Sequence, residues 1–162
     1  MIYETERFIL RRFQASDLEA ICLMESDEEV MKMTGPGRAQ TTAESQARLE
    51  RILAHSSRVS CGGYWAATLK TNGELVGWFM LLSMDIEQTQ FELGFMIRKD
   101  CWGQGYAGEI ARHLVEMAKL DSNINELVAK TSKDNQASQK LLISCGFTLK
   151  RSAELVEFNK FV

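Results

Sequence analysis

Residues 101–109 read CWGQGYAGE, and the three glycines of this stretch form the pattern G-x-G-x-x-G. The preceding segment 90–100, QFELGFMIRKD, alternates apolar residues with other residues and therefore predicts a strand. The following segment 110–120 has apolar residues at helical spacing and predicts a helix. A glycine-rich turn at a helix N-terminus leaves backbone N–H groups uncovered, and the helix dipole adds positive potential there. Such a turn suits a bound pyrophosphate.

The residues around the glycines leave three interpretations open. A dinucleotide-binding fold needs the first glycine almost directly after a strand, and an acid about 20 residues further on at the end of the next strand. Here KDCW at 99–102 separates the strand from Gly103, and Asp121 precedes the next expected strand instead of ending it. The second interpretation is a plain turn, and the third is a site for another phosphate group.

The rest of the chain predicts a mixed sheet with helices on both faces, in one domain of residues 1–162. Asn72-Gly73 lies between two apolar runs and is typical of a hairpin turn, so we expect the flanking strands to pair antiparallel. Ser16 or Asp17 is expected to cap the first helix, and a Thr-x-x-Ser cap to open the second. The expected strands are 6–13, 63–70, 74–83, 90–98, 125–131 and a closing pair within 147–161; the expected helices are 16–26, 42–56, a helix from the glycines to about 120, and 135–145.

Composition limits the class of partner. The net charge of −3 and the pI near 5.5 argue against a broad basic face for nucleic acid. The start MIYETERFILRRF carries charges early, and no apolar run is long enough to cross a membrane, so we expect neither a signal peptide nor a membrane partner. Four scattered cysteines and two histidines show no metal-ligand or disulfide spacing. We therefore expect a cytoplasmic protein without a metal.

Two segments together resemble a known family. ELGFMIRKDCWGQGYAGEIARHLVEMA at 92–118, followed by NQASQKLLISCGF at 135–147, closely resembles the acyl-CoA-binding core of the GNAT superfamily of N-acetyltransferases. The opening TERFILRRFQASDLEAICLMESDEEVMKMTG at 5–35 is similar to the branch typified by the ribosomal-protein alanine acetyltransferases RimJ and RimL. The resemblance implies an α/β fold with a central, mostly antiparallel, twisted sheet and helices on both faces.

The resemblance also implies where acetyl-CoA, the expected co-substrate, binds. Backbone N–H groups of the glycine loop would wrap its pyrophosphate, at Gly103, Gln104, Gly105, Tyr106, Ala107 and Gly108. The pantetheine arm would fill a gap where the strand at 90–98 and the strand at 125–131 splay apart, pairing with Phe95, Met96 and Ile97. Asn135 and Ser138, at the head of the last helix, would face the arm and the thioester sulfur.

The chemistry expected at this site is the direct attack of an amine on the thioester carbonyl. The amine has to be neutral, which is easier for an α-amino group, with a pKa of about 7.7–8.0, than for a lysine at about 10.4. Glu92 is the candidate base, directly or through a water, and a backbone N–H at or near Met96 is the candidate oxyanion donor. Many relatives carry a tyrosine acid where this chain has Leu142, so Ser138 is the candidate partner of the departing sulfur.

The sequence thus predicts an N-acetyltransferase whose acceptor is a protein N-terminus or a small amine, and it permits a homodimer. Two alternatives stay open. One is an acyl-CoA-binding protein without catalysis, which the missing tyrosine favours. The other is a nicotinamide-dependent enzyme, which the glycine pattern alone would allow.

Overall fold

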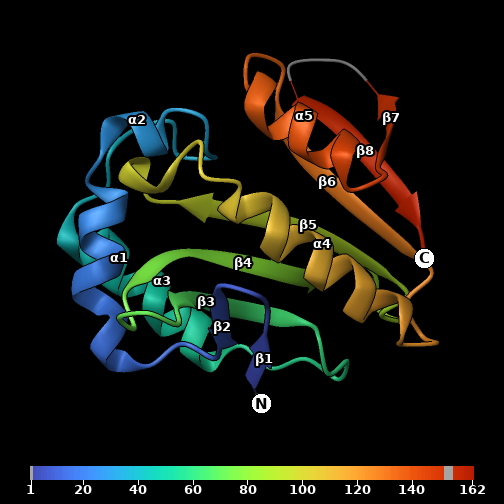
Figure 1. Cartoon of the computed structure of the whole chain (residues 1–162), viewed down its shortest axis with the longest axis horizontal. Coiled ribbons are helices and arrows are strands. Elements are labelled where there is room, and N and C mark those ends of the chain that lie inside the picture. Colours follow the sequence, from blue (N-terminus) through green and yellow to red (C-terminus); the bar gives the residue numbers. More distant parts are fainter. Residues whose placement is uncertain (1, 152–154) are drawn as a thin grey trace.

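The structure, a computed structural model, describes residues 2–151 and 155–162. Within these residues, eight strands form one sheet in the order β1-β2-β3-β4-β5-β6-β8-β7 (Figure 1). Their bounds are β1 Ile2–Glu4, β2 Phe8–Arg11, β3 Gly63–Leu69, β4 Leu75–Ser83, β5 Gln90–Ile97, β6 Glu126–Ser132, β7 Thr148–Arg151 and β8 Leu155–Phe161. Only the β5–β6 pair of this described sheet is parallel. A dinucleotide-binding fold needs a mostly parallel sheet, so that alternative is excluded.

Helices cover both faces of the sheet, as expected. They are α1 Leu18–Glu25, α2 Glu28–Met31, α3 Thr42–Ala54, α4 Tyr106–Lys119 and α5 Gln136–Ser144. Apolar side chains of α1, α2 and α3 form one buried cluster with Ala66, Trp78 and Met96 of the sheet. The apolar stripe of α4 and Leu142 of α5 belong to a second cluster, on the opposite face. No helix among the described residues is long and apolar enough to span a bilayer.

The local sequence signals placed most of these elements correctly. β3 and β4 pair antiparallel on either side of the Asn72-Gly73 turn. Asp17 is the N-cap of α1, one of the two residues expected there, whereas the cap of α3 differs from the expectation. The side chain of Asp17 makes no cap hydrogen bond to α1 and instead pairs with Arg11, whose Nη2 lies 2.7 Å from Asp17 Oδ1. The cap of α3 is a Thr41–Glu44 capping box, so the Thr-x-x-Ser prediction was one residue late.

The parallel pair β5–β6 is short, and it sets the geometry of the site. Its register runs only from Gln90 opposite Glu126 to Glu92 opposite Val128. Beyond Glu92, β5 continues to Ile97 beside β4, while β6 diverges from it and pairs with β8 (Figure 1). The expected splaying of these two strands is therefore confirmed.

At Gly77, the backbone of β4 approaches closely the part of β5 that diverges from β6. A Cβ on Gly77 would overlap the carbonyl oxygen of Met96 and lie 3.0 Å from Ile97 Cα. We therefore predict that Gly77→Ala lowers the free energy of unfolding by about 1–3 kcal/mol, because backbone atoms cannot move aside as a side chain can.

Gly35→Ala is the matched control for this substitution. No atom lies within 4 Å of a Cβ placed on Gly35. Urea denaturation of both variants is the measurement. Equal stabilities for the two alanine variants would contradict the close approach of β4 and β5.

Candidate functional site

The glycine loop presents a row of unbonded backbone N–H groups. Gly103 and Gly105 have φ of +74° and +75°, a left-handed conformation that strongly favours glycine, and Gly105 is the N-cap of α4. The first helical hydrogen bond is donated by Glu109 N to Gly105 O at 3.1 Å. Within the described part of the chain, the N–H groups of 103–108 donate no hydrogen bond. The loop therefore offers donors and a helix dipole to an anion.

Three side-chain hydrogen bonds to main-chain carbonyls hold this loop in place. Trp102 Nε1 donates to Ile97 O at 2.8 Å, which ties the loop to the end of β5. Gln104 Nε2 donates to Asp100 O at 3.2 Å. Arg7, from the turn between β1 and β2, donates through Nη1 to Gln104 O at 3.0 Å. These three carbonyls are thus occupied by side-chain donors, while the N–H groups of residues 103–108 have no partner in the described chain.

Glu109, in the first turn of α4, is the anchor that sequence reasoning missed. Its Oε1 accepts from Thr5 Oγ1 at 2.6 Å and from Arg7 N at 2.9 Å, and its Oε2 accepts from Arg7 Nε at 2.6 Å. Burial would raise the pKa of Glu109, but these hydrogen bonds outweigh burial and hold the pKa below its usual range. The partners lie more than 100 positions apart in the chain, so no local pattern indicates the contact.

Along β5, successive backbone N–H and C=O groups point alternately to β4 and to the side of β6. This alternation determines which N–H groups face the gap between β5 and β6. Arg98 N donates to Val76 O at 2.9 Å, and Met84 N donates to Gln90 O at 2.8 Å. In the antiparallel register, the backbone groups of the even-numbered residues of β5 therefore point to β4. Those of Phe95 and Ile97 point the other way, beyond the last β5–β6 pair.

This alternation narrows the expected oxyanion donor, at or near Met96, to one residue. The N–H of Met96 belongs to the β4–β5 ladder opposite Trp78, and its side chain is buried against α1–α3. The N–H of Phe95 is the free donor next to it on the edge of β5. The side-chain pattern indicated the strand, but it did not show the phase of the hydrogen bonds.

Glu92 sits where the pairing of β5 and β6 ends, with its side chain on the sheet face that α1–α3 cover further along. Lys130 lies two residues beyond Val128, the last residue of β6 that pairs with β5, and its side chain is on the same face of the sheet as Glu92. Its Nζ is 3.6 Å from Glu92 Oε2. The side chain of Glu92 is 29% exposed and that of Lys130 is 35% exposed. A pair this open is weak and exchanges readily with solvent or another cation.

Asn135 and Ser138 lie at the head of α5, directly after β6. Asn135 is the N-cap, and its Oδ1 accepts from Ser138 N at 3.1 Å. The hydroxyl of Ser138 is half-buried and makes no hydrogen bond within residues 2–151 and 155–162. Leu142, one turn further, is buried in the core with 1% exposure. The helix thus offers one unengaged hydroxyl.

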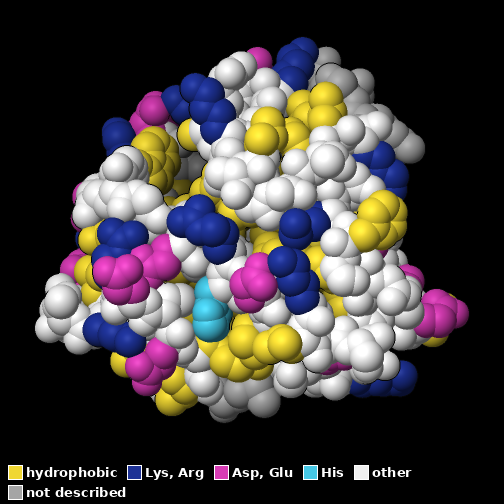
Figure 2. All heavy atoms as spheres, turned by 45° about the vertical axis from the view of Figure 1, so that its right-hand side comes forward, with side chains coloured by type: hydrophobic (Ala, Val, Ile, Leu, Met, Phe, Trp, Pro, Cys, Tyr) yellow, Lys and Arg dark blue, Asp and Glu magenta, His cyan; other side chains and the backbone are white. Residues whose placement is uncertain are grey.

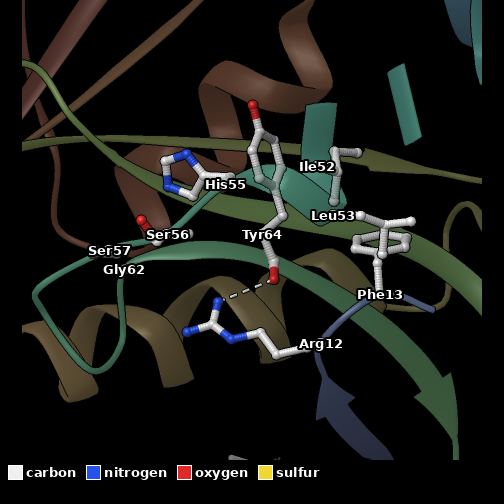
Figure 3. Close-up of a pocket in the computed structure, with 10 residues that line it drawn as sticks. Arg12, Phe13, Ile52, Leu53, His55, Ser56, Ser57, Gly62 and Tyr64 are labelled. Atoms are coloured by element: carbon white, nitrogen blue, oxygen red, sulfur yellow. Dashed lines mark hydrogen bonds between the residues drawn. The ribbon is translucent and has the colours of Figure 1, made fainter. Parts of the chain in front are cut away.

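A pocket of about 300 Å³ opens between the end of α3 and the start of β3 (Figure 3). His55 and Tyr64 lie side by side on one flank, with ring centroids 5.4 Å apart, and Phe13, Ile52 and Leu53 form an apolar flank. Tyr64 stands opposite Met80 of β4, which stands opposite Gly94 of β5. Side chains opposite one another share a face, so Tyr64 lies on the Glu92 face, two strands away.

The surface of the protein carries basic groups despite the net charge of −3. On the face shown in Figure 2 the surface is hollowed, with hydrophobic side chains visible in the hollow and Lys and Arg side chains on its rim. Such a rim suits an anionic ligand with an apolar part. Among the described residues, no group of three or more His, Cys, Asp or Glu is placed to hold a metal ion.

A sheet that opens at a strand edge beside a glycine-rich helix N-terminus is the arrangement expected for the donor site of an acyltransferase. Residues 7–148 match the family model described as acetyltransferase (GNAT) domain. The chain therefore belongs to the GNAT acetyltransferase family.

Relatives agree with this assignment. A protein of Aspergillus fumigatus named FsC-acetyl coenzyme A-N(2)-transacetylase is 31% identical over 138 residues, which cover 77% of this chain and 55% of that protein. The chain thus spans about half the length of this relative. A Bacillus licheniformis protein named uncharacterized N-acetyltransferase p20 is 29% identical over 144 residues, 88% of this chain and 80% of that one.

Among solved structures, RimL, described as a ribosomal L7/L12 alpha-N-protein acetyltransferase in complex with coenzyme A, superposes with a TM-score of 0.83. The superposition covers 100% of this chain and 98% of the RimL chain, and the two sequences are 15% identical. At this identity the likeness shows the shared fold alone, and the RimJ/RimL branch stays a prediction.

Proposed function

We propose that this protein transfers the acetyl group of acetyl-CoA to a primary amine by direct attack. The observation that carries the proposal is the row of unbonded N–H groups at 103–108, next to the unpaired edge of β5. The RimL neighbour is described in complex with coenzyme A, which supports the same donor here. A cytoplasmic location and a homodimer remain predictions.

The donor is held mainly by backbone groups in this proposal. Its diphosphate accepts hydrogen bonds from the N–H groups of residues 103–108 at the N-terminus of α4. Its pantetheine arm adds to the free edge of β5 at the carbonyl of Phe95 and at Ile97, as an extended peptide adds to a sheet edge, and leaves the N–H of Phe95 to the thioester. The thioester then lies near the end of the β5–β6 pairing, beside Glu92 and within the reach of α5.

The reaction needs a base, an oxyanion donor and a stabilised leaving group. Glu92 accepts the proton of the attacking amine, directly or through a water, after the acceptor has replaced Lys130 beside it. The N–H of Phe95 donates to the developing oxyanion. The hydroxyl of Ser138 donates to the departing sulfur, whose pKa near that of cysteine, about 8.5, makes it a tolerable leaving group without a stronger acid.

The acceptor approaches from the Glu92 face of the sheet. The pocket beside Tyr64 lies on that face, two strands or about 10 Å from β5. Its volume of about 300 Å³ is at the lower end of small-ligand pockets. Apolar and polar flanks of this size suit the first residue of a protein N-terminus or a short amine better than a large apolar substrate.

The donor and the reaction are tested by binding and by turnover. Calorimetry with coenzyme A, acetyl-CoA, NAD and ATP is expected to give binding with the two CoA species only. Thiol release is then measured with acetyl-CoA over peptides with free N-termini, amino acids and polyamines. Binding without thiol release from any amine would identify a non-catalytic binder. Absence of CoA binding would refute the proposal.

The oxyanion donor is tested by removing a single N–H group. Phe95→Pro deletes the donor, and because this N–H faces away from β4, no hydrogen bond of the β4–β5 ladder is lost. Phe95→Ala is the matched control, since it removes the ring and keeps the N–H. We predict a kcat for Phe95→Pro about 100-fold or more below that of Phe95→Ala. Equal kcat values for the two variants would contradict the assignment of the Phe95 N–H as the oxyanion donor.

The base and the hydroxyl are tested together across pH. Glu92→Gln is expected to lower kcat about 100-fold or more, because proton removal from the amine is lost. Ser138→Ala is expected to lower kcat about tenfold, because a hydrogen bond to a charged leaving group is lost. Glu116→Gln, at an exposed glutamate paired with Lys119 on α4, is the control. If neither variant changes kcat at any pH, both assignments are wrong.

A further inference from the structure

The turn between β1 and β2 reaches across the molecule to the glycine loop. Thr5 N donates to Phe8 O at 3.0 Å and Phe8 N donates to Thr5 Oγ1 at 3.1 Å, which closes the turn. Arg7 projects from it, and its guanidinium carbon lies 4.7 Å from the centre of the Tyr106 ring, in the first turn of α4. A segment outside the glycine loop therefore forms part of its surroundings.

Arg7 uses two of its three guanidinium nitrogens to fix the loop and the helix. Nε binds Glu109 Oε2 at 2.6 Å, and Nη1 binds Gln104 O at 3.0 Å. Nη2 makes no hydrogen bond within the ranges that the structure describes, and it lies 3.8 Å from the position of a Cβ on Gly105. The side chain is 40% exposed, and this nitrogen, close to Gly105, is left without a partner in the described chain.

The negative charge of Glu109 affects anion binding at the N-terminus of α4, so its contact with Arg7 has an electrostatic consequence as well as a structural one. An acid in the first turn of a helix is favourable alone, but it opposes a second anion at the same helix end. Glu109 is 14% exposed, so water screens its charge poorly. Arg7 neutralises this carboxylate and leaves the helix end open to an anion.

We infer that Arg7 completes the diphosphate site of the donor. This inference rests on the proposed function. Nε and Nη1 position Glu109 and the loop, while Nη2 donates to a phosphate oxygen of acetyl-CoA. The planar, forked guanidinium supplies three directed donors at once, which a lysine ammonium on a flexible stem cannot reproduce. Arg7 is thus both a positioning residue for the loop and a binding residue for the diphosphate.

The experiment compares two acetyl donors, acetyl-CoA and S-acetylpantetheine, which lacks the diphosphate. Arg7→Ala is expected to raise the KM for acetyl-CoA and the Kd for coenzyme A about tenfold or more. The kcat/KM for S-acetylpantetheine stays within about twofold of the wild type. Dephospho-CoA, without the 3′-phosphate, is expected to lose affinity by the same factor as coenzyme A. Arg7→Lys is expected to lie between the wild type and Arg7→Ala.

A double variant separates the charge effect from a merely structural role. In Arg7→Ala the carboxylate of Glu109 is left unneutralised beside the diphosphate, so adding Glu109→Gln is expected to restore CoA affinity about threefold. Lys119→Ala, which removes one positive charge at the other end of α4, is the control and leaves the Kd unchanged. Thermal unfolding of every variant shows whether it is folded.

Three outcomes would overturn the inference. One is an equal loss with both acetyl donors, which would make Arg7 structural. Another is no loss of CoA affinity in Arg7→Ala. The third is a loss for coenzyme A but not for dephospho-CoA, which would place Arg7 at the 3′-phosphate. A wild-type protein that does not bind coenzyme A would instead refute the proposed function, so the two failures are distinguishable.

Discussion

The early end of the β5–β6 pairing is the constraint on which the site depends. Two neighbouring parallel strands normally satisfy each other's backbone groups along their whole length. Here the ladder stops at Glu92 opposite Val128, so the part of β5 beyond it keeps a hydrogen-bonding edge that no described strand uses. Because β4 pairs with β5 from Phe91 to Ile97, the β4 ladder holds that edge in an extended conformation. A fixed, unsatisfied strand edge is a template for an extended ligand.

The second half of the site depends on contacts between distant parts of the chain. A helix N-terminus supplies unbonded N–H groups in any protein, but here their direction is set from outside the helix. Trp102 ties the loop to the end of β5, and the turn carrying Thr5 and Arg7 holds Glu109 in the first helical turn. The strand edge and the helix end are therefore fixed relative to one another, which a two-part ligand requires.

The sequence predicted those features that depend on residues close together in the chain. The period of the apolar residues gave the strands and α4, Asn72-Gly73 gave the hairpin, and the glycines gave the loop at the helix start. It did not predict β1 or the one-turn α2, which are too short to show a period. It placed the oxyanion donor only at or near Met96, because side-chain alternation does not reveal which neighbouring strand each backbone group faces. The Arg7–Glu109 contact was also missed, since it depends on the folded topology.

The proposed donor site consists mainly of backbone groups, which depend on the fold more than on the identity of particular side chains. Glycines with positive φ, a strand edge and a helix end can be kept by many sequences, and a neighbour at 15% identity still superposes with a TM-score of 0.83. The Glu92 face is different, because it is formed by side chains such as Tyr64, His55 and Lys130. Side chains change without altering the sheet. In the proposed function, donor recognition thus depends on backbone geometry, whereas acceptor choice depends on the side chains of the Glu92 face.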